Sequence, residues 1–121
     1  MILVDTSVWV DHLQHGNAHL ANSLVRGEVL AHSFVLGELA LGNLRQRTQV
    51  LEAMSQLPMA KAATDSEVLE FIARQFLFGR GIGYVDAHLL AAVRLTPGSR
   101  LWTLDKRLLA AASALDLAWT D

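Results

Sequence analysis

The chain has 121 residues, of which 52% are hydrophobic, with a formal net charge of −2 and no cysteine. This length suits one domain over residues 1–121 with one sizeable core, and it excludes two independent domains. The lack of cysteine excludes a disulfide framework and thiolate zinc sites, and agrees with a cytoplasmic location. The apolar start resembles a strand more than a signal peptide, and no run is long enough to span a bilayer, so we expect no membrane association.

The hydrophobic pattern predicts strands that alternate with helices. Residues 1–4 are uniformly apolar and predict a buried parallel strand, and residues 28–31 and 100–103 predict two more. Residues 59–62 and 117–119 are expected as short edge strands. The chain is therefore predicted to be an α/β domain with a central parallel sheet of four to five strands flanked by helices.

Helices are expected between these strands, and three of them carry start signals. Ser33 is a predicted N-cap, Thr64 and Glu67 form a capping-box pattern, and Gly83 is the expected N-cap of a later helix. The expected helices cover residues 6–13, 19–25, 33–42, 45–57, a segment after Thr64, a segment after Gly83, and 106–114.

Four separated carboxylates are the strongest functional signal in the sequence. Asp5 and Asp105 each follow a predicted strand, while Glu38 and Asp86 lie in the early turns of helices. In an open parallel sheet, ligands bind beyond the carboxyl ends of the strands, so these acids are expected to gather at one edge. Such a concentration of negative charge calls for a cation.

Carboxylate oxygens suit Mg²⁺ or Mn²⁺, and one or two ions are expected at this edge. A bound ion of this kind lowers the pKa of water and stabilises charge on a phosphodiester, which predicts a metal-dependent hydrolase. Thr6, Ser7 and Thr103 are short hydroxyl residues beside the acids, and they are expected to hydrogen-bond a carboxylate or a metal-bound water.

Four stretches of sequence resemble the PIN-domain ribonucleases, most closely the VapC-type toxins of prokaryotic toxin–antitoxin pairs. They occur in the family's order and extend over the whole chain. The four stretches are Ile-Leu-Val-Asp5-Thr-Ser7, Val35-Leu-Gly-Glu38-Leu-Ala-Leu-Gly42, Tyr84-Val-Asp86-Ala-His-Leu-Leu-Ala-Ala92 and Leu101-Trp-Thr103-Leu-Asp105.

The resemblance implies a three-layer fold, Mg²⁺- or Mn²⁺-dependent endonucleolytic cleavage of RNA, and a homodimer. It also implies a cognate antitoxin whose C-terminal segment lies over the active site. By the same resemblance, the four acids inherit the metal-binding and catalytic roles, and Ser7 and Thr103 inherit the supporting hydroxyl positions. Many relatives carry another acid shortly after the position of Asp105, whereas here Lys106 and Arg107 follow, which leaves a second metal position open.

An acidic net charge looks unsuited to an RNA-binding protein until it is partitioned. Setting aside the four acids leaves eight acids against ten Lys and Arg, so the rest of the chain is slightly basic. Arg80, Lys106 and Arg107 are the expected contacts for RNA phosphates. Trp9, in the first helix, is the expected contact for the antitoxin or a dimer partner, whereas Phe76 and Phe78 are expected in the core.

Other interpretations of the sequence are weaker. A haloacid-dehalogenase phosphatase needs a second Asp two residues after Asp5, where Ser7 stands. A response-regulator-like domain lacks its adjacent acidic pair. The remaining alternative is a catalytically inactive PIN-like module that binds protein or RNA.

Three local patterns are set aside. The histidines at 12, 15 and 19 do not share a helix because Gly16 interrupts them, so we expect no zinc site. The glycine-rich stretch 79–83 lacks the fingerprint of a phosphate-binding loop. His88 follows Asp86 by two residues, so it faces another side of the helix and is given no catalytic role.

Overall fold

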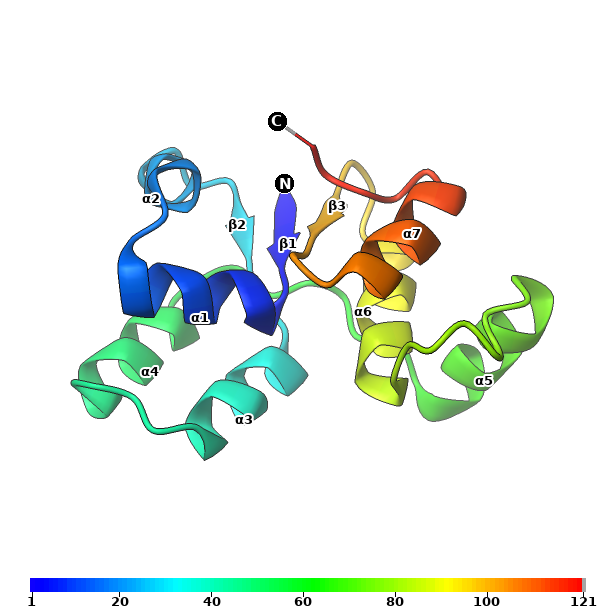
Figure 1. Cartoon of the computed structure of the whole chain (residues 1–121), viewed down its shortest axis with the longest axis horizontal. Coiled ribbons are helices and arrows are strands. Elements are labelled where there is room, and N and C mark those ends of the chain that lie inside the picture. The colour runs from blue at the N-terminus through cyan, green and yellow to red at the C-terminus, as the bar shows by residue number, and fades with distance from the viewer. Residues whose placement is uncertain (121) are drawn as a thin grey trace.

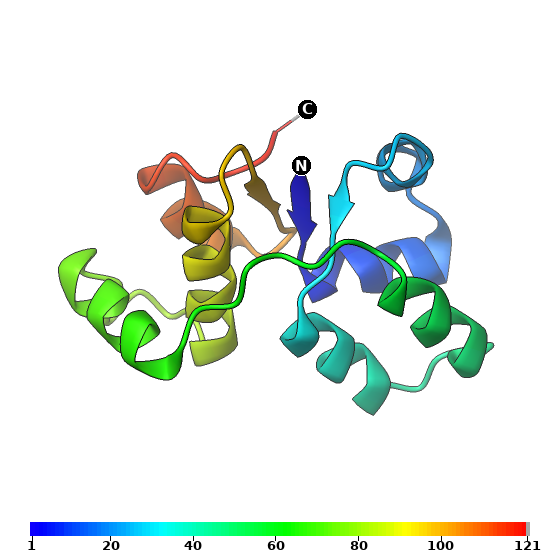
Figure 2. The same ribbon diagram turned by 180° about the vertical axis from the view of Figure 1, so that it is seen from behind.

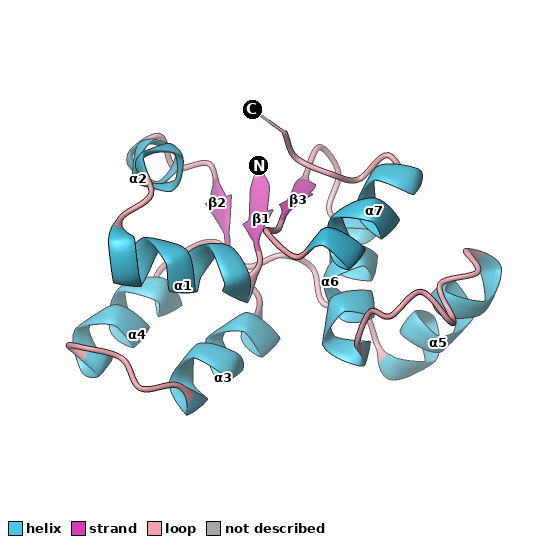
Figure 3. Cartoon of the chain, viewed as in Figure 1, coloured by secondary structure: helices cyan, strands magenta, loops and turns pink. Residues whose placement is uncertain are grey.

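A computed structural model describes residues 1–120. Its sheet is parallel, with the strand order β2-β1-β3. The strands are β1 (Ile2–Val4), β2 (Val29–Leu30) and β3 (Arg100–Trp102), and every strand residue except Arg100 is buried. Figure 3 shows the three strands side by side in the middle of the molecule, all running the same way.

Among residues 1–120 the sheet has three strands, so the expectation of four to five is wrong. Residues 59–62 pair with the sheet only through a bridge between Met59 and Ala31. The amide of Ala31 donates to the carbonyl of Pro58, and the amide of Ala60 donates to the carbonyl of Ala31, each at 2.8 Å. The pairing does not extend to earlier residues because Pro58 has no amide hydrogen to donate.

The expected last strand, residues 117–119, also makes a single bridge, between Ala118 and Leu101. The amide of Leu117 donates to the carbonyl of Ala112 (2.8 Å), which closes the preceding helix and leaves this amide unavailable to a ladder. The Trp119 ring packs instead against Trp102, with ring centroids 4.3 Å apart.

Helices flank the sheet on both sides (Figure 1). In Figure 1, α1 to α4 lie on one side of the strands and α5 to α7 on the other. Figure 2, the view from behind, shows the segment between α4 and α5 crossing in front of the lower ends of the strands. The helices are α1 (Thr6–His15), α2 (Ala18–Val25), α3 (Ser33–Leu41), α4 (Arg47–Ser55), α5 (Asp65–Arg74), α6 (Tyr84–Leu95) and α7 (Lys106–Ala114).

Two of the three predicted helix starts are confirmed. Thr64 and Glu67 form a reciprocal capping box at α5, and Gly83 is the N-cap of α6. The predicted N-cap Ser33 is wrong, because His32 takes that position and its Nδ1 accepts from the amide of Phe34 (3.0 Å). His32 is only 1% exposed, so its ring also fills space in the core.

The core packs the strands against buried side chains of α1 to α4, α6 and α7. Residues 87–93 of α6 are all buried. Trp9 is a core residue and only 3% exposed. Its side chain offers almost no surface to an antitoxin or a dimer partner, so that expectation is wrong. Phe76 and Phe78, expected in the core, are 66% and 65% exposed. Within residues 1–120, no helix has both the length and the hydropathy to traverse a bilayer.

Candidate metal centre

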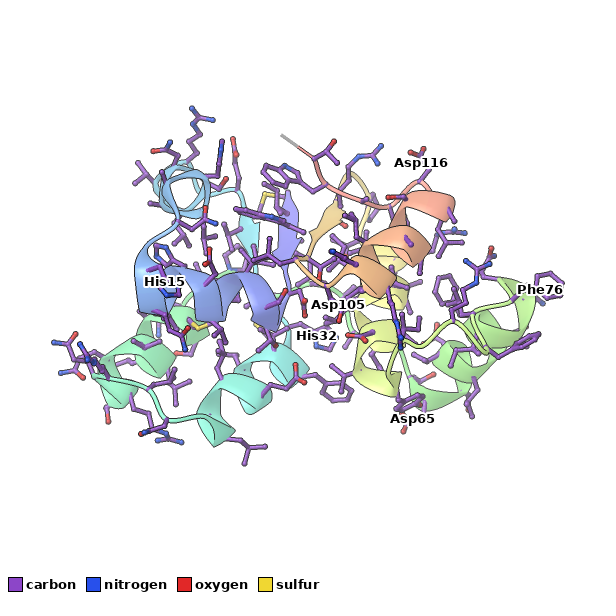
Figure 4. All side chains as sticks on the ribbon, in the orientation of Figure 1. His15, His32, Asp65, Phe76, Asp105 and Asp116 are labelled. Carbon is purple, nitrogen blue, oxygen red and sulfur yellow. The ribbon has the colours of Figure 1, made fainter. Side chains whose placement is uncertain are left out.

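The candidate centre lies at the carboxyl edge of the sheet. Asp5 links β1 to α1, and Asp105 follows β3 as the N-cap of α7. Glu38 lies on α3, and Asp86 is in the first turn of α6. Figure 1 shows α1 and α7 starting just beyond the ends of the strand arrows, and Figure 4 places Asp105 near the centre of the molecule.

Asp5 is the buried member of the four, with 6% of its surface exposed. Its Oδ2 accepts hydrogen bonds from the hydroxyls of Ser7 and Thr103, each at 2.7 Å. A carboxylate removed from water needs such donors, and bonds to an ionised acceptor are the stronger kind. Ser7 and Thr103 therefore lie where the sequence led us to expect supporting hydroxyls.

The same arrangement recurs at Glu38 and Asp86. Glu38 Oε1 accepts from the hydroxyl of Thr6 at 2.6 Å. Asp86 Oδ2 accepts from the amide of Gly83 at 2.9 Å, which ties this carboxylate to the start of α6.

Asp105 is held by the start of its own helix. Its Oδ1 accepts from the amides of Arg107 (2.9 Å) and Leu108 (3.0 Å). Across the part of the chain that the structure describes, each of the four acids thus has one oxygen held by the protein's own donors. No donor within residues 1–120 reaches the second oxygen, which leaves it available to a ligand.

The pKa of Asp86 is raised above its usual value by its partial burial, and the other three acids contribute to this shift. Partial burial is the main cause that raises the pKa of Asp86, and the Gly83 amide partly opposes it. The charges of Asp5, Asp105 and Glu38 raise this pKa further. Asp86 therefore experiences the other three carboxylates, and a cation among them would relieve this repulsion.

The donor chemistry fits a hard divalent cation, because all four groups offer carboxylate oxygens. Within residues 1–120, no three acidic or histidine side chains already converge closely enough to hold an ion. Like charges are expected to stand apart without a counter-ion, and Mg²⁺ keeps several of its waters, so bridging waters can span the remaining gaps.

Comparison with known proteins gives the family. Residues 2–114 match the PIN domain. The chain belongs to the PIN-domain family. It is 48% identical over 118 residues to Ribonuclease VapC32 of Mycobacterium tuberculosis, from strains H37Rv and CDC 1551 alike. The alignments cover 98% of this chain and 95% of those relatives, which confirms the resemblance to the VapC-type branch drawn from the sequence motifs.

The crystal structure of PAE2754 from Pyrobaculum aerophilum shares the fold of this PIN domain. The TM-score is 0.60 at 23% sequence identity, and the match covers 92% of this chain and 78% of that one. The likeness supports the arrangement of a parallel sheet between helices.

The three cations expected at the RNA, Arg80, Lys106 and Arg107, are exposed in this PIN domain. None of them forms an ion pair with an acid in the described chain. A Cβ built on Gly81 would lie 2.6 Å from a terminal nitrogen of Arg107, so the Arg107 side chain lies directly against this glycine.

A polar cluster beside the first turn of α6 was missed from the sequence. Asp65 Oδ1 accepts from the Tyr84 hydroxyl (2.7 Å) and lies 3.1 Å from Nε2 of His88, which is 3% exposed. Hydrogen bonds from Tyr84 and then His88 lower the pKa of Asp65. The four-residue spacing of Tyr84 and His88 was a visible signal that both share one helix face. The hydrogen bond and ring contacts of His88 are with Asp65, Phe34 and Tyr84, and none within residues 1–120 is with the four acids.

The histidines of the first two helices make local contacts. His12 Nδ1 accepts from the amide of Asn17 (3.0 Å), and His15 lies 3.5 Å from Asp11 at the surface. No group in residues 1–120 that could hold a metal includes them.

Proposed function

We propose that this PIN domain is a Mg²⁺- or Mn²⁺-dependent endoribonuclease and the toxin component of a type II toxin–antitoxin module. The observation that carries the proposal is the shared geometry of Asp5, Glu38, Asp86 and Asp105. Each presents one unpaired oxygen while the other is fixed by the fold. The relatives named Ribonuclease VapC32 support RNA as the substrate.

The four carboxylates would hold one or two ions at the sheet edge. When bound, such an ion supplies an activated water and neutralises charge on the phosphodiester. The chain's own contribution is to fix the ligands. Ser7 and Thr103 lock the Asp5 carboxylate in one orientation, and Thr6 does the same for Glu38.

The remaining two acids are fixed by helix starts. Asp86 and Asp105 accept hydrogen bonds from backbone amides at the starts of α6 and α7. The helix dipoles favour negative charge at these positions. Lys106 and Arg107 follow Asp105 directly and offer positive charge to the substrate phosphates. Fixed ligands beside free cations are a suitable arrangement for positioning an RNA strand against a metal-activated water.

Asp5→Asn and Asp86→Asn test this proposal against Glu52→Gln, which changes an exposed acid on α4. We expect wild type and Glu52→Gln to cleave RNA with Mg²⁺ or Mn²⁺, with cleavage lost in EDTA. Both site variants should lose at least about 100-fold in rate while their circular dichroism stays native. Full cleavage by both site variants would rule out this centre.

The antitoxin is proposed to occupy a groove of about 850 Å³ between α1, α3 and α4. The groove reaches Thr6 and Glu38, so a segment bound in it would lie over the candidate centre. Val10 and Leu13 contribute its apolar wall, at 36% and 37% exposure. Leu13→Asp should therefore keep RNA cleavage but escape neutralisation when the toxin and antitoxin are co-expressed in cells.

Two further properties complete the proposal. We propose that the protein acts as a homodimer, which sedimentation of the purified chain will test. We also propose that it acts in the cytoplasm, where both an RNA substrate and an antitoxin would meet it. A chain that sediments as a monomer at micromolar concentration would refute the proposed homodimer.

The second candidate function is a catalytically inactive PIN-like module that binds RNA or protein. It is favoured by the lack, within residues 1–120, of three side chains that already converge on a metal position. Isothermal titration with Mn²⁺ separates the two candidates. Saturable binding that disappears in Asp86→Asn supports the nuclease, and no binding supports the inactive module.

A further inference from the structure

The loop between α5 and α6, residues 75–83, exposes two aromatic rings. Phe76 and Phe78 are 66% and 65% exposed, and their rings meet edge to face with centroids 6.1 Å apart. Figure 4 places Phe76 at the outer end of the molecule, away from Asp105 at its centre. Two neighbouring phenylalanines left in water form an aromatic surface that the fold itself does not use.

The backbone at Phe76 makes the exposure more informative. Phe76 has a φ of +54°, and it follows α5 where Leu77 N donates back to the carbonyl of Ile72 (3.0 Å). Glycine is the residue that this left-handed helix-end position favours. A bulky side chain is strained there, and burial does not compensate because the ring lies in solvent. Strain retained at an exposed residue points to a role for the ring itself.

The surroundings of the two rings are basic. Residues 71–85 contain two arginines and no acid. Arg74 pairs with Glu70 at 2.7 Å, whereas Arg80 donates only its Nε, to the carbonyl of Phe76 at 3.0 Å. The terminal nitrogens of Arg80 therefore have no acidic partner in the described chain and remain available to a phosphate.

Positive charge continues from this loop to the candidate metal centre. Arg107 lies against Gly81 within the loop, and it belongs to the same helix start that holds Asp105. The loop ends at Gly83, whose amide holds Asp86. Figure 1 shows the loop returning from the outer end of α5 to the start of α6. An RNA strand bound at Phe76 and Phe78 could therefore extend along these positive charges to Asp86 and Asp105.

We propose that Phe76, Phe78 and Arg80 form a binding surface for an unpaired RNA strand, with bases stacked on the rings and a phosphate on the guanidinium. Proteins that bind single-stranded nucleic acids use this combination of exposed aromatic rings, which stack on bases, and free arginines, which bind phosphates. The inference rests on the proposed function, because it names how the substrate of that centre is held.

The geometry also sets a length. The Cα atoms of Phe78 and Gly83 are separated by at most about 18 Å along an extended chain. Stacked nucleotides rise about 3.4 Å each, so about five of them cover this span. Because about 18 Å is an upper limit, at most about five stacked nucleotides lie along this part of the loop. Figure 4 places Phe76 away from Asp105, so the surface is proposed to hold bases that are not adjacent to the cleaved bond, which a dinucleotide lacks.

The test compares Phe76→Gly and Phe78→Ala with Leu41→Ala, which truncates a 90% exposed side chain at the end of α3. Two readouts are needed. The first is fluorescence anisotropy of a labelled, unpaired RNA of about 12 nucleotides bound to the metal-free protein. The second is cleavage of that RNA and of a dinucleotide in Mg²⁺ or Mn²⁺.

We expect each phenylalanine variant to weaken RNA binding and raise KM for the longer RNA about 10-fold, the effect typical of losing one stacked base. Their kcat and their cleavage of the dinucleotide should match wild type, as should all properties of Leu41→Ala. Phe76→Gly should melt no lower than wild type because glycine suits the left-handed backbone.

Unchanged binding of the longer RNA in both variants overturns the inference, and so does an equal loss on the dinucleotide. If Phe78→Ala instead turns a dimer into a monomer with KM unchanged, the rings form a protein interface and the inference is wrong. A wild type that binds the longer RNA through these rings without cleaving it refutes the proposed nuclease and keeps the binding surface. These outcomes therefore distinguish a failure of the RNA-binding surface from a failure of the proposed nuclease.

Discussion

Replacing Thr103 by valine tests how strongly the fold depends on one hydroxyl beside Asp5. Thr103 is 4% exposed, and its hydroxyl donates to Asp5 Oδ2 at 2.7 Å while it accepts from the amide of Asp105 at 3.0 Å. Valine has nearly the same shape, so packing is kept, and the change removes these two hydrogen bonds together with a longer contact to the Ser7 hydroxyl (3.4 Å).

The expected loss of stability follows from these two bonds. A buried hydrogen bond to a charged group contributes about 1.5–3 kcal/mol, and a neutral one about 1 kcal/mol. The hydroxyl of Ser7 remains on Asp5 Oδ2, so the carboxylate keeps one donor. We therefore expect Thr103→Val to lower the free energy of unfolding by about 3 kcal/mol, or the melting temperature by about 10 °C.

Urea unfolding in EDTA measures the change, because stability without a bound ion reports on the protein alone. The slope against urea should stay constant, since the unfolded surface is the same. The matched control is Thr48→Val on α4, an exposed threonine whose hydroxyl has no hydrogen-bond partner in the described residues. The control should change stability by less than about 0.5 kcal/mol.

A Thr103→Val protein as stable as the Thr48→Val control would refute the reasoning, because Asp5 would then not need the hydroxyl. Thr103→Ser gives the converse check. It restores the donor and loses one methyl group, so it should recover most of the stability and all of the Mn²⁺ affinity that valine removes.

Three further predictions follow from individual contacts. The raised pKa of Asp86 means that ionising this carboxyl lowers the stability of the fold, an effect absent below pH 4 and present at neutral pH. In EDTA, Asp86→Asn should therefore melt higher than wild type at pH 7 and at the same temperature as wild type at pH 3.5. In Mn²⁺ at pH 7, wild type should melt higher than the variant. Gly81→Ala should lose about 1–2 kcal/mol in urea unfolding because alanine is strained at a φ of +75°, and it should raise KM for RNA by displacing Arg107. Thr64→Ala removes the cap that holds the Glu67 amide at 3.1 Å and should cost about 1 kcal/mol.

Local sequence signals predicted local structure well. The capping box at Thr64 and the N-cap at Gly83 involve residues three apart, so the sequence contains the whole interaction. The positions of Asp5 and Asp105 were also accessible, because both follow apolar runs that form parallel strands and such strands end at one edge.

Features that depend on distant partners were not accessible. The amide of Lys61 donates to the hydroxyl of Thr96, which is 35 residues away, and no local pattern links the two residues. Asp65 lies 23 residues from His88, and nothing in the sequence connects the two. Hydrophobicity alone placed Phe76 in the core, because it carries no information on which apolar side chains the tertiary structure leaves outside.

The Asp5–Thr103 hydrogen bond joins residues 98 positions apart in the chain. During synthesis the first strand leaves the ribosome long before its neighbour β3, by about 5 to 20 seconds at ordinary translation rates. A nascent polypeptide that ends before Thr103 lacks both this partner and the Asp105 carboxylate. Under the proposed function, unfinished chains would therefore be inactive, and cleavage of RNA would begin only when synthesis of the chain is nearly complete.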